Sequence, residues 1–145
     1  MFKSKKTQKS YSKTTAKNSK RLGAITAEVA ICLPVLFLLT FGCLEMAGAN
    51  MLKHATESAA YEGARIGILP GATQAGVQQA VDKVLDSIGA EGSSVEILPQ
   101  TITAETEEIE VVVTVPYAPN AWIAPFIIQS NPTFRSSCTL RREQL

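Results

Sequence analysis

An apolar stretch from residue 23 to residue 49 constrains this chain more than any other feature. It reads GAITAEVAICLPVLFLLTFGCLEMAGA and carries one carboxylate near each end, Glu28 and Glu45. Residues 29–49 would form a helix about 31 Å long, which is enough to cross the hydrocarbon core of a bilayer. We therefore predict a transmembrane helix over residues 24–49. An ionisable group is unfavourable inside such a helix, so Glu28 requires a physical explanation.

The distribution of charge predicts the orientation of this helix. Residues 1–22 contain eight Lys or Arg and no acid, which leaves six bases and all 13 acids, a net charge of −7, in residues 23–145. Basic residues next to an apolar helix hold that end in the cytoplasm. A basic segment can also bind nucleic acid, but its position beside the apolar stretch favours the membrane interpretation. We expect no nucleic-acid partner.

The helical pattern continues beyond the apolar stretch to about residue 67, where the breaker pair Pro70-Gly71 follows. Small residues recur there at four-residue spacing and form a ridge that allows another backbone to approach closely. The ridge is predicted to pack either against the protein's own domain or against another subunit. It consists of Ala55, Ala59, Gly63 and Gly67.

The remaining chain predicts a small α+β domain. Val77, Val81 and Leu85 repeat at helical spacing, which indicates a second, amphipathic helix. Three segments near residues 93–100, 108–117 and 133–143 are predicted strands, and the last two alternate in the manner of half-buried strands. The bases of the third segment can lie beside the acids at 107–110, so these two strands are expected to pair. The predicted fold is a long N-terminal membrane helix that continues into a second helix and a roughly three-stranded antiparallel sheet. The APFII run at 124–128 is either exposed or packed.

No catalytic constellation is recognisable in the sequence. The chain has one histidine and three widely spaced cysteines, so the sequence lacks the clustered ligands of a metal site. It also lacks a phosphate-binding loop and a nucleophile elbow. We expect a protein that is not an enzyme, with no catalytic residues, no metal and no cofactor.

Three interpretations compete for residues 1–49. A cleavable signal peptide would be cut after Ala49, although the apolar region is long for one and contains two carboxylates. An uncut signal anchor explains the length but not Glu28. In the third interpretation the chain is cut between Gly23 and Ala24, and Glu28 becomes the fifth residue of the mature protein.

The third arrangement resembles the processing site of type IV pilin-like proteins. The run AEVAICLPVLFLLTFGCLEMAGA is similar to the opening helix of TadE-like pseudopilins of tight-adherence (Flp-type) pilus systems, and ESAAYEGARIG (57–67) is similar to their Ala-Ala-x-Glu-Gly-Ala-Arg block. The resemblance covers residues 21–67 well and the β-rich remainder only in general shape. It implies three parts: a cleavable basic cytoplasmic leader (1–23), a transmembrane helix (24–49) and an extracytoplasmic α+β domain (50–145).

The resemblance also implies a role for Glu28 and a function. The carboxylate of Glu28 would pair with the free amine of Ala24 or with that of a neighbouring subunit; otherwise it would lie among lipid headgroups. The implied function is assembly of an adhesive pilus or a related secretion apparatus from the bacterial inner membrane, with the C-terminal domain in the periplasm or outside the cell. The implied partners are other pilin-like subunits, the pilus assembly machinery and a prepilin peptidase. The alternative is a periplasmic binding module, secreted or held by a signal anchor, with no role in a pilus.

Overall fold

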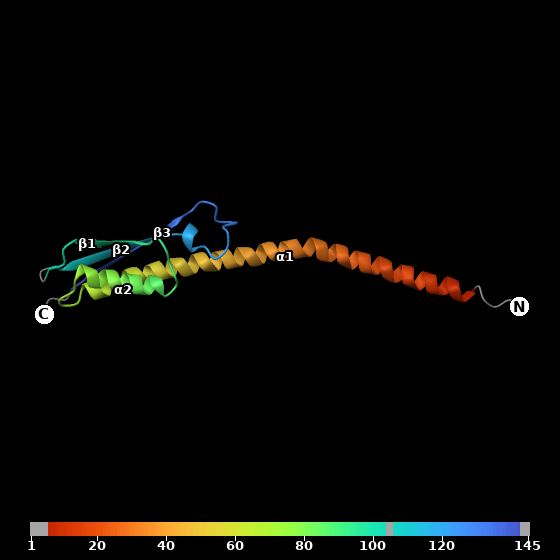
Figure 1. Ribbon diagram of the computed structural model, residues 1–145, viewed down its shortest axis with the longest axis horizontal. Coiled ribbons are helices and arrows are strands. Elements are labelled where there is room, and N and C mark those ends of the chain that lie inside the picture. Colours follow the sequence, from red (N-terminus) through yellow and green to blue (C-terminus); the bar gives the residue numbers. More distant parts are fainter. Residues whose placement is uncertain (1–5, 104–105, 143–145) are drawn as a thin grey trace. The chain divides into compact units, whose positions relative to one another are not determined.

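The computed structural model describes residues 6–103 and 106–142, with side chains from residue 23 onward. Along the chain lie helices α1 (Lys6–Gly67) and α2 (Gln74–Asp86), strands β1 (Ser94–Leu98) and β2 (Glu108–Pro116), the short 3-10 helix η1 (Ala118–Asn120) and strand β3 (Thr133–Arg141) (Figure 1). The chain divides into two compact units, Met1–Phe41 and Gly42–Leu145.

Helix α1 begins earlier than the sequence predicts and ends where it predicts. The predicted helix begins at residue 24, whereas α1 begins at Lys6. Residues 6–22 contain neither Gly nor Pro and include several lysines, which have good helix propensity. Every side chain from residue 23 to residue 41 is exposed. Within the described part of the chain, Gly23–Gly67 is the one helix that is long and apolar enough to cross a membrane.

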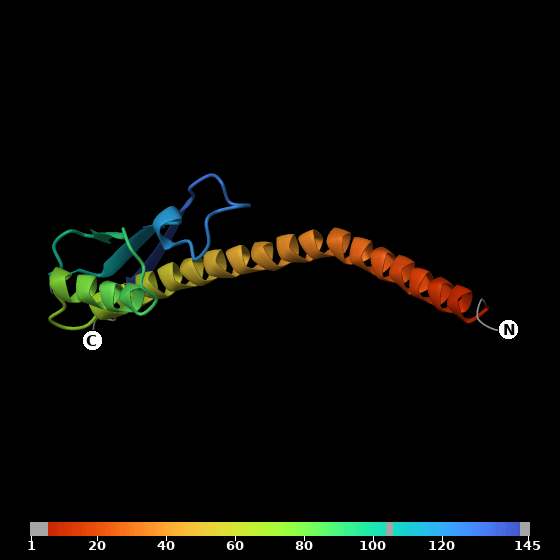
Figure 2. The same ribbon diagram turned by 45° about the vertical axis from the view of Figure 1, so that its right-hand side comes forward.

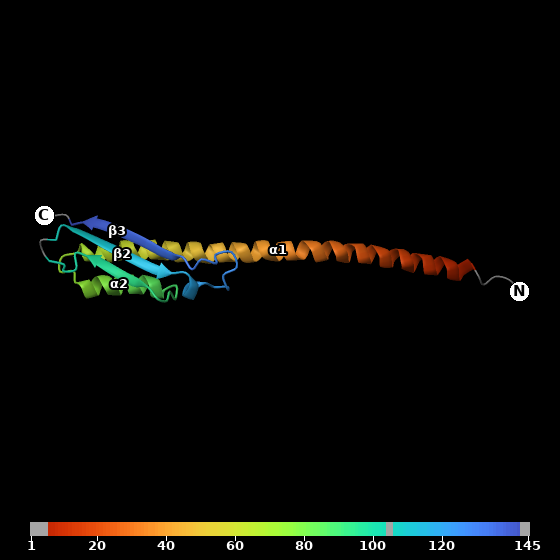
Figure 3. The ribbon, with the colours of Figure 1, turned by 90° about the horizontal axis from the view of Figure 1, so that it is seen from above.

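The second unit contains a three-stranded antiparallel sheet in the order β1-β2-β3. Figure 3 shows the strands lying side by side. In the register Val113 pairs with Val95 on one side and with Ser136 on the other. Charged side chains meet at one end of the β2–β3 pair, where Glu108 is opposite Arg141. The α+β class predicted from the sequence is therefore confirmed.

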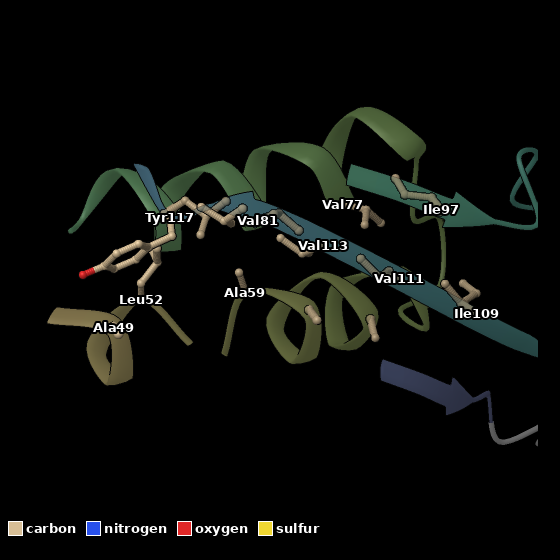
Figure 4. Close-up of a cluster of buried hydrophobic side chains, with 14 residues drawn as sticks. Ala49, Leu52, Ala59, Val77, Val81, Ile97, Ile109, Val111, Val113 and Tyr117 are labelled. Carbon is tan, nitrogen blue, oxygen red and sulfur yellow. The ribbon is translucent and has the colours of Figure 1, made fainter. Parts of the chain in front are cut away.

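The core of this unit lies between one face of the sheet and the two helices (Figure 4). Alternate residues of β2 are fully buried, as expected for a strand with one covered face. Helix α2 contributes Val77, Val81 and Leu85, which share one side because they are four residues apart. Its first turn is capped by Thr73, whose side chain accepts a hydrogen bond from the Gly76 N–H (3.2 Å). Helix α1 contributes Ala59, Ala60 and Ala64, which are all fully buried.

Candidate functional site

The residues of the predicted cleavage site lie on the exposed surface of α1, in the first unit. Gly23, Ala24 and Glu28 are all exposed. A Cβ atom added at Gly23 would meet no other atom within 4 Å. Large apolar side chains around Glu28 also point outward; Val29 is 50% exposed and Ile31 is 72% exposed. An apolar surface of this kind indicates contact with lipid or with another protein.

The small-residue ridge lies in the second unit, against the interior of its domain. Ala59 is fully buried, Gly63 and Gly67 are buried, and Ala55 is half-buried. A Cβ at Gly63 would lie 2.7 Å from Cγ2 of Val81. A Cβ at Gly67 would lie 3.1 Å from Cγ2 of Ile109. The two glycines thus allow the α1 backbone to approach α2 and the sheet.

Glu45 binds a loop that is distant in the sequence. Glu45 is only 4% exposed, and its carboxylate accepts three backbone hydrogen bonds. Oε2 accepts from the N–H groups of Phe126 (3.2 Å) and Ile127 (2.8 Å), and Oε1 accepts from that of Ile128 (2.7 Å). Figure 2 shows this segment, in blue, returning beside α1. The APFII run, which the sequence left undecided, is therefore attached through its backbone.

The core next to this carboxylate ends in Tyr117, whose ring is 2% exposed and meets Phe134 edge-on at 6.2 Å between ring centroids. Burial, together with a smaller effect of the Glu45 carboxylate, raises the pKa of the Tyr117 phenol. The phenol therefore stays protonated at higher pH than in an unfolded chain. The backbone N–H of Tyr117 donates to the Pro132 carbonyl (2.9 Å), which closes the base of the loop.

Arg142 caps the C-terminal end of α1. Its guanidinium donates to the carbonyl oxygens of Gly67 (3.2 Å), Ile68 (3.0 Å) and Leu69 (3.3 Å). It also donates to the carbonyl of Thr103 (3.0 Å). The last carbonyls of a helix lack partners within the helix, and a cation there also interacts favourably with the helix dipole.

Sequence reasoning missed the Glu45 and Arg142 contacts. The Glu45 contacts join residues 81 to 83 positions apart and those of Arg142 join residues 39 to 75 positions apart, so no local periodicity reports them. The signal available for Glu45 was its charge: a carboxylate in an apolar helix requires hydrogen-bond donors. Among the residues that the structure describes, no group of three or more His, Cys, Asp or Glu side chains could hold a metal ion.

These features define a class of protein: one apolar helix, suited by length and composition to be a single-pass membrane anchor, continues into a small α+β domain. The family model described as TadE-like protein matches residues 23–65, so the family predicted from the sequence is confirmed over this segment. The match begins at Gly23 and includes Glu28, Glu45 and most of the small-residue ridge. No curated protein and no solved structure matches the chain.

Proposed function

We propose that this protein is a non-enzymatic, membrane-anchored, pseudopilin-like subunit that takes part in assembling a tight-adherence pilus or a related secretion apparatus. The observation that carries the proposal is the match of residues 23–65 to TadE-like proteins. The match begins at Gly23, the glycine that follows the basic leader, and it includes Glu28 five residues later. The partners would be other pilin-like subunits and the assembly machinery of the inner membrane.

The proposal includes cleavage between Gly23 and Ala24 by a prepilin peptidase. The exposure of both residues and the open space around Gly23 support access to this bond. Cleavage would remove the eight basic residues and leave a free amine on Ala24. The leader would first hold this end in the cytoplasm by its positive charge, so the domain from residue 50 onward would be outside.

Glu28 would then pair with an amine. Its carboxylate is one helical turn beyond Ala24, so the amine of the same chain or of a neighbouring subunit can approach it. In an apolar environment an unpaired carboxylate is strongly unfavourable, and a paired one is much less so. The exposed apolar side chains beside Glu28 would meet lipid before assembly and the helices of other subunits afterwards.

N-terminal sequencing of the mature protein, isolated from membranes of its own host, tests the cleavage. We expect the chain to begin at Ala24. A start at Asn50 would identify a secreted protein and overturn the proposal, because the anchor would be lost. A start at Met1 would contradict the cleavage and leave an uncut anchor. Replacement of the glycine by a bulky residue, Gly23→Leu, should leave the leader attached.

Assembly is tested with a Glu28→Ala variant that replaces the wild-type protein in the host. We expect fewer surface pili and weaker co-purification with partner pilins. Glu57→Ala is the matched control, because Glu57 is also an exposed glutamate of α1 but lies outside the apolar stretch. Normal assembly by Glu28→Ala would refute the pairing role, and normal pili in a strain that lacks the protein would refute the proposed function.

A further inference from the structure

The loop between β2 and β3 has an unusual composition for an extracytoplasmic surface. Residues 118–132 contain no charged side chain. Three of their large apolar side chains are mostly exposed: Trp122 (64%), Phe126 (60%) and Ile127 (52%). Exposed apolar side chains gathered in one segment mark a contact surface more often than ordinary solvent-exposed loop.

This loop is attached to the end of the apolar stretch of α1. The Glu45 carboxylate accepts hydrogen bonds from the backbone N–H groups of Phe126, Ile127 and Ile128. On either side of Glu45, the loop covers two glycines. A Cβ at Gly42 would lie 2.9 Å from Cδ1 of Ile127, and a Cβ at Gly48 would lie 3.7 Å from the Trp122 ring.

These contacts place the loop at a defined level along the helix. Gly42 and Gly48 both belong to the predicted transmembrane stretch, which ends at residue 49. Seven residues of helix separate Gly42 from that end, which corresponds to about 10 Å. A membrane that covers the stretch to residue 49 therefore also reaches the loop.

The backbone of the loop is suited to that environment. Irregular backbone is unfavourable in a bilayer because its N–H and C=O groups lack water. Here one buried carboxylate satisfies three consecutive N–H groups. Phe126 and Ile127 remain 60% and 52% exposed although their amides are bonded inward, whereas Ile128 is half-buried. Tryptophan is enriched where a membrane meets water, because its ring is apolar and its N–H is polar.

We propose that residues 122–127 insert into the outer interface of the membrane, beside their own transmembrane helix. The ligand of this surface is the lipid bilayer itself: Trp122 lies at the level of the headgroups, and Phe126 and Ile127 contact acyl chains. Glu45 is a positioning residue, because its carboxylate holds the loop against α1. The inference depends on the membrane anchor of the proposed function and does not depend on a role in a pilus.

Trp122 is the only tryptophan of the chain, so its fluorescence reports on this loop alone. The full-length protein is reconstituted into vesicles of phosphatidylcholine and phosphatidylglycerol, with or without phosphatidylcholine brominated on its acyl chains. We expect bromine to remove about half of the Trp122 emission, as for a tryptophan at the interface. The matched control combines Trp122→Phe with Tyr61→Trp. This moves the probe to an exposed position on α1, about 20 Å along the helix from Gly48, which Trp122 covers. It should keep nearly all its emission.

The inference is overturned if the brominated lipid quenches Trp122 no more than it quenches the control probe. If the Trp122 emission is not quenched but changes with the protein-to-lipid ratio, the loop contacts a second copy of the protein. This result would also overturn the inference. Extraction with alkaline carbonate separates this failure from that of the anchor. Protein that resists extraction but keeps Trp122 unquenched refutes only the loop, whereas extracted protein refutes the anchor. Glu45→Gln should weaken the quenching without releasing the protein from the vesicles.

Discussion

Replacement of Gly63 by alanine tests the close packing of α1 against the rest of its domain. The added Cβ would lie 2.7 Å from Cγ2 of Val81 and 3.2 Å from Cγ1 of Val111. Ordinary contacts of a Cβ begin at about 3.4 Å, so the Val81 methyl group must move by about 0.7 Å or the helices must separate. Because Val81 and Val111 are both fully buried, neither has open space to enter.

Two effects of opposite sign determine the change in the free energy of unfolding. Alanine stabilises a helix interior by about 1 kcal/mol relative to glycine. Overpacking of a dense core destabilises by about 1 to 3 kcal/mol. The steric effect is larger, so Gly63→Ala should destabilise the domain by about 1 kcal/mol, with an upper limit near 2. For a domain of this size, a loss of 1 kcal/mol lowers the Tm by roughly 4 to 8 °C.

The assay is thermal unfolding of the full-length protein in detergent micelles, followed by Trp122 fluorescence. Gly76→Ala is the matched control, because the nearest atom to its added Cβ is Oγ1 of Thr73 at 3.4 Å. That variant should be as stable as the wild type or more stable by up to about 1 kcal/mol. Adding Val81→Ala to Gly63→Ala removes the clashing methyl group. The double variant should therefore be at least about 1 kcal/mol more stable than the sum of the single effects.

The reasoning fails if Gly63→Ala raises the Tm as much as Gly76→Ala does. It also fails if the effects of Gly63→Ala and Val81→Ala add to within about 0.5 kcal/mol, as they would for residues that do not touch. Either result would mean that helix propensity, and not contact with α2, dominates at this position.

Three further predictions concern single side chains. Arg142→Ala should lower the free energy of unfolding by about 1 to 2 kcal/mol, because the carbonyls of Gly67, Ile68 and Leu69 lose a charged donor. Arg135→Ala, at a mostly exposed arginine, should change the Tm little. Folding raises the pKa of the Tyr117 phenol, so the neutral phenol contributes fully to stability below about pH 10 and this contribution is lost as the pH rises further. Tyr117→Phe should remove this decline in stability when unfolding is measured between about pH 9 and 11. Burial also raises the pKa of the Cys138 thiol, so peptide mass spectrometry should find it alkylated more slowly by iodoacetamide at pH 8 in the folded protein than in urea; equal rates would contradict this.

Local patterns in the sequence were sufficient to predict most of the second unit. Alternation in β2 and the four-residue repeat in α2 each follow from one buried face, so they report the element and its orientation together. Pairing of β2 with β3 followed from complementary charges, and Arg141 indeed forms an ion pair with Glu107 (3.2 Å). The small residues at 59, 63 and 67 were recognisable because only small side chains permit such close approach of a helix.

The contacts that attach the loop and the end of α1 were not predictable in this way. A hydrogen bond from Ile128 to Glu45 spans 83 positions, and its donor is a backbone group that every residue other than proline possesses. The apolar side chains of 124–128 gave no indication of direction, because the hydrogen bonds to Glu45 come from the amides of Phe126, Ile127 and Ile128. Arg142 was equally inconspicuous among the bases of the C-terminal strand.

The two carboxylates of the apolar stretch therefore obey the same requirement in different ways. Glu45 is buried and satisfied entirely by three amides of its own domain, so its partners are present in a single folded chain. Glu28 is exposed and forms no hydrogen bond or ion pair with the residues that the structure describes. An apolar environment would require a partner for it as well. In our proposal that partner is either the amine created by the cut at Gly23 or a group of another subunit. The charge of Glu28 is therefore connected to processing and assembly, and the charge of Glu45 to the fold. The carboxylate that the folded chain satisfies is thus structural, and the one that it leaves exposed is the better candidate for function.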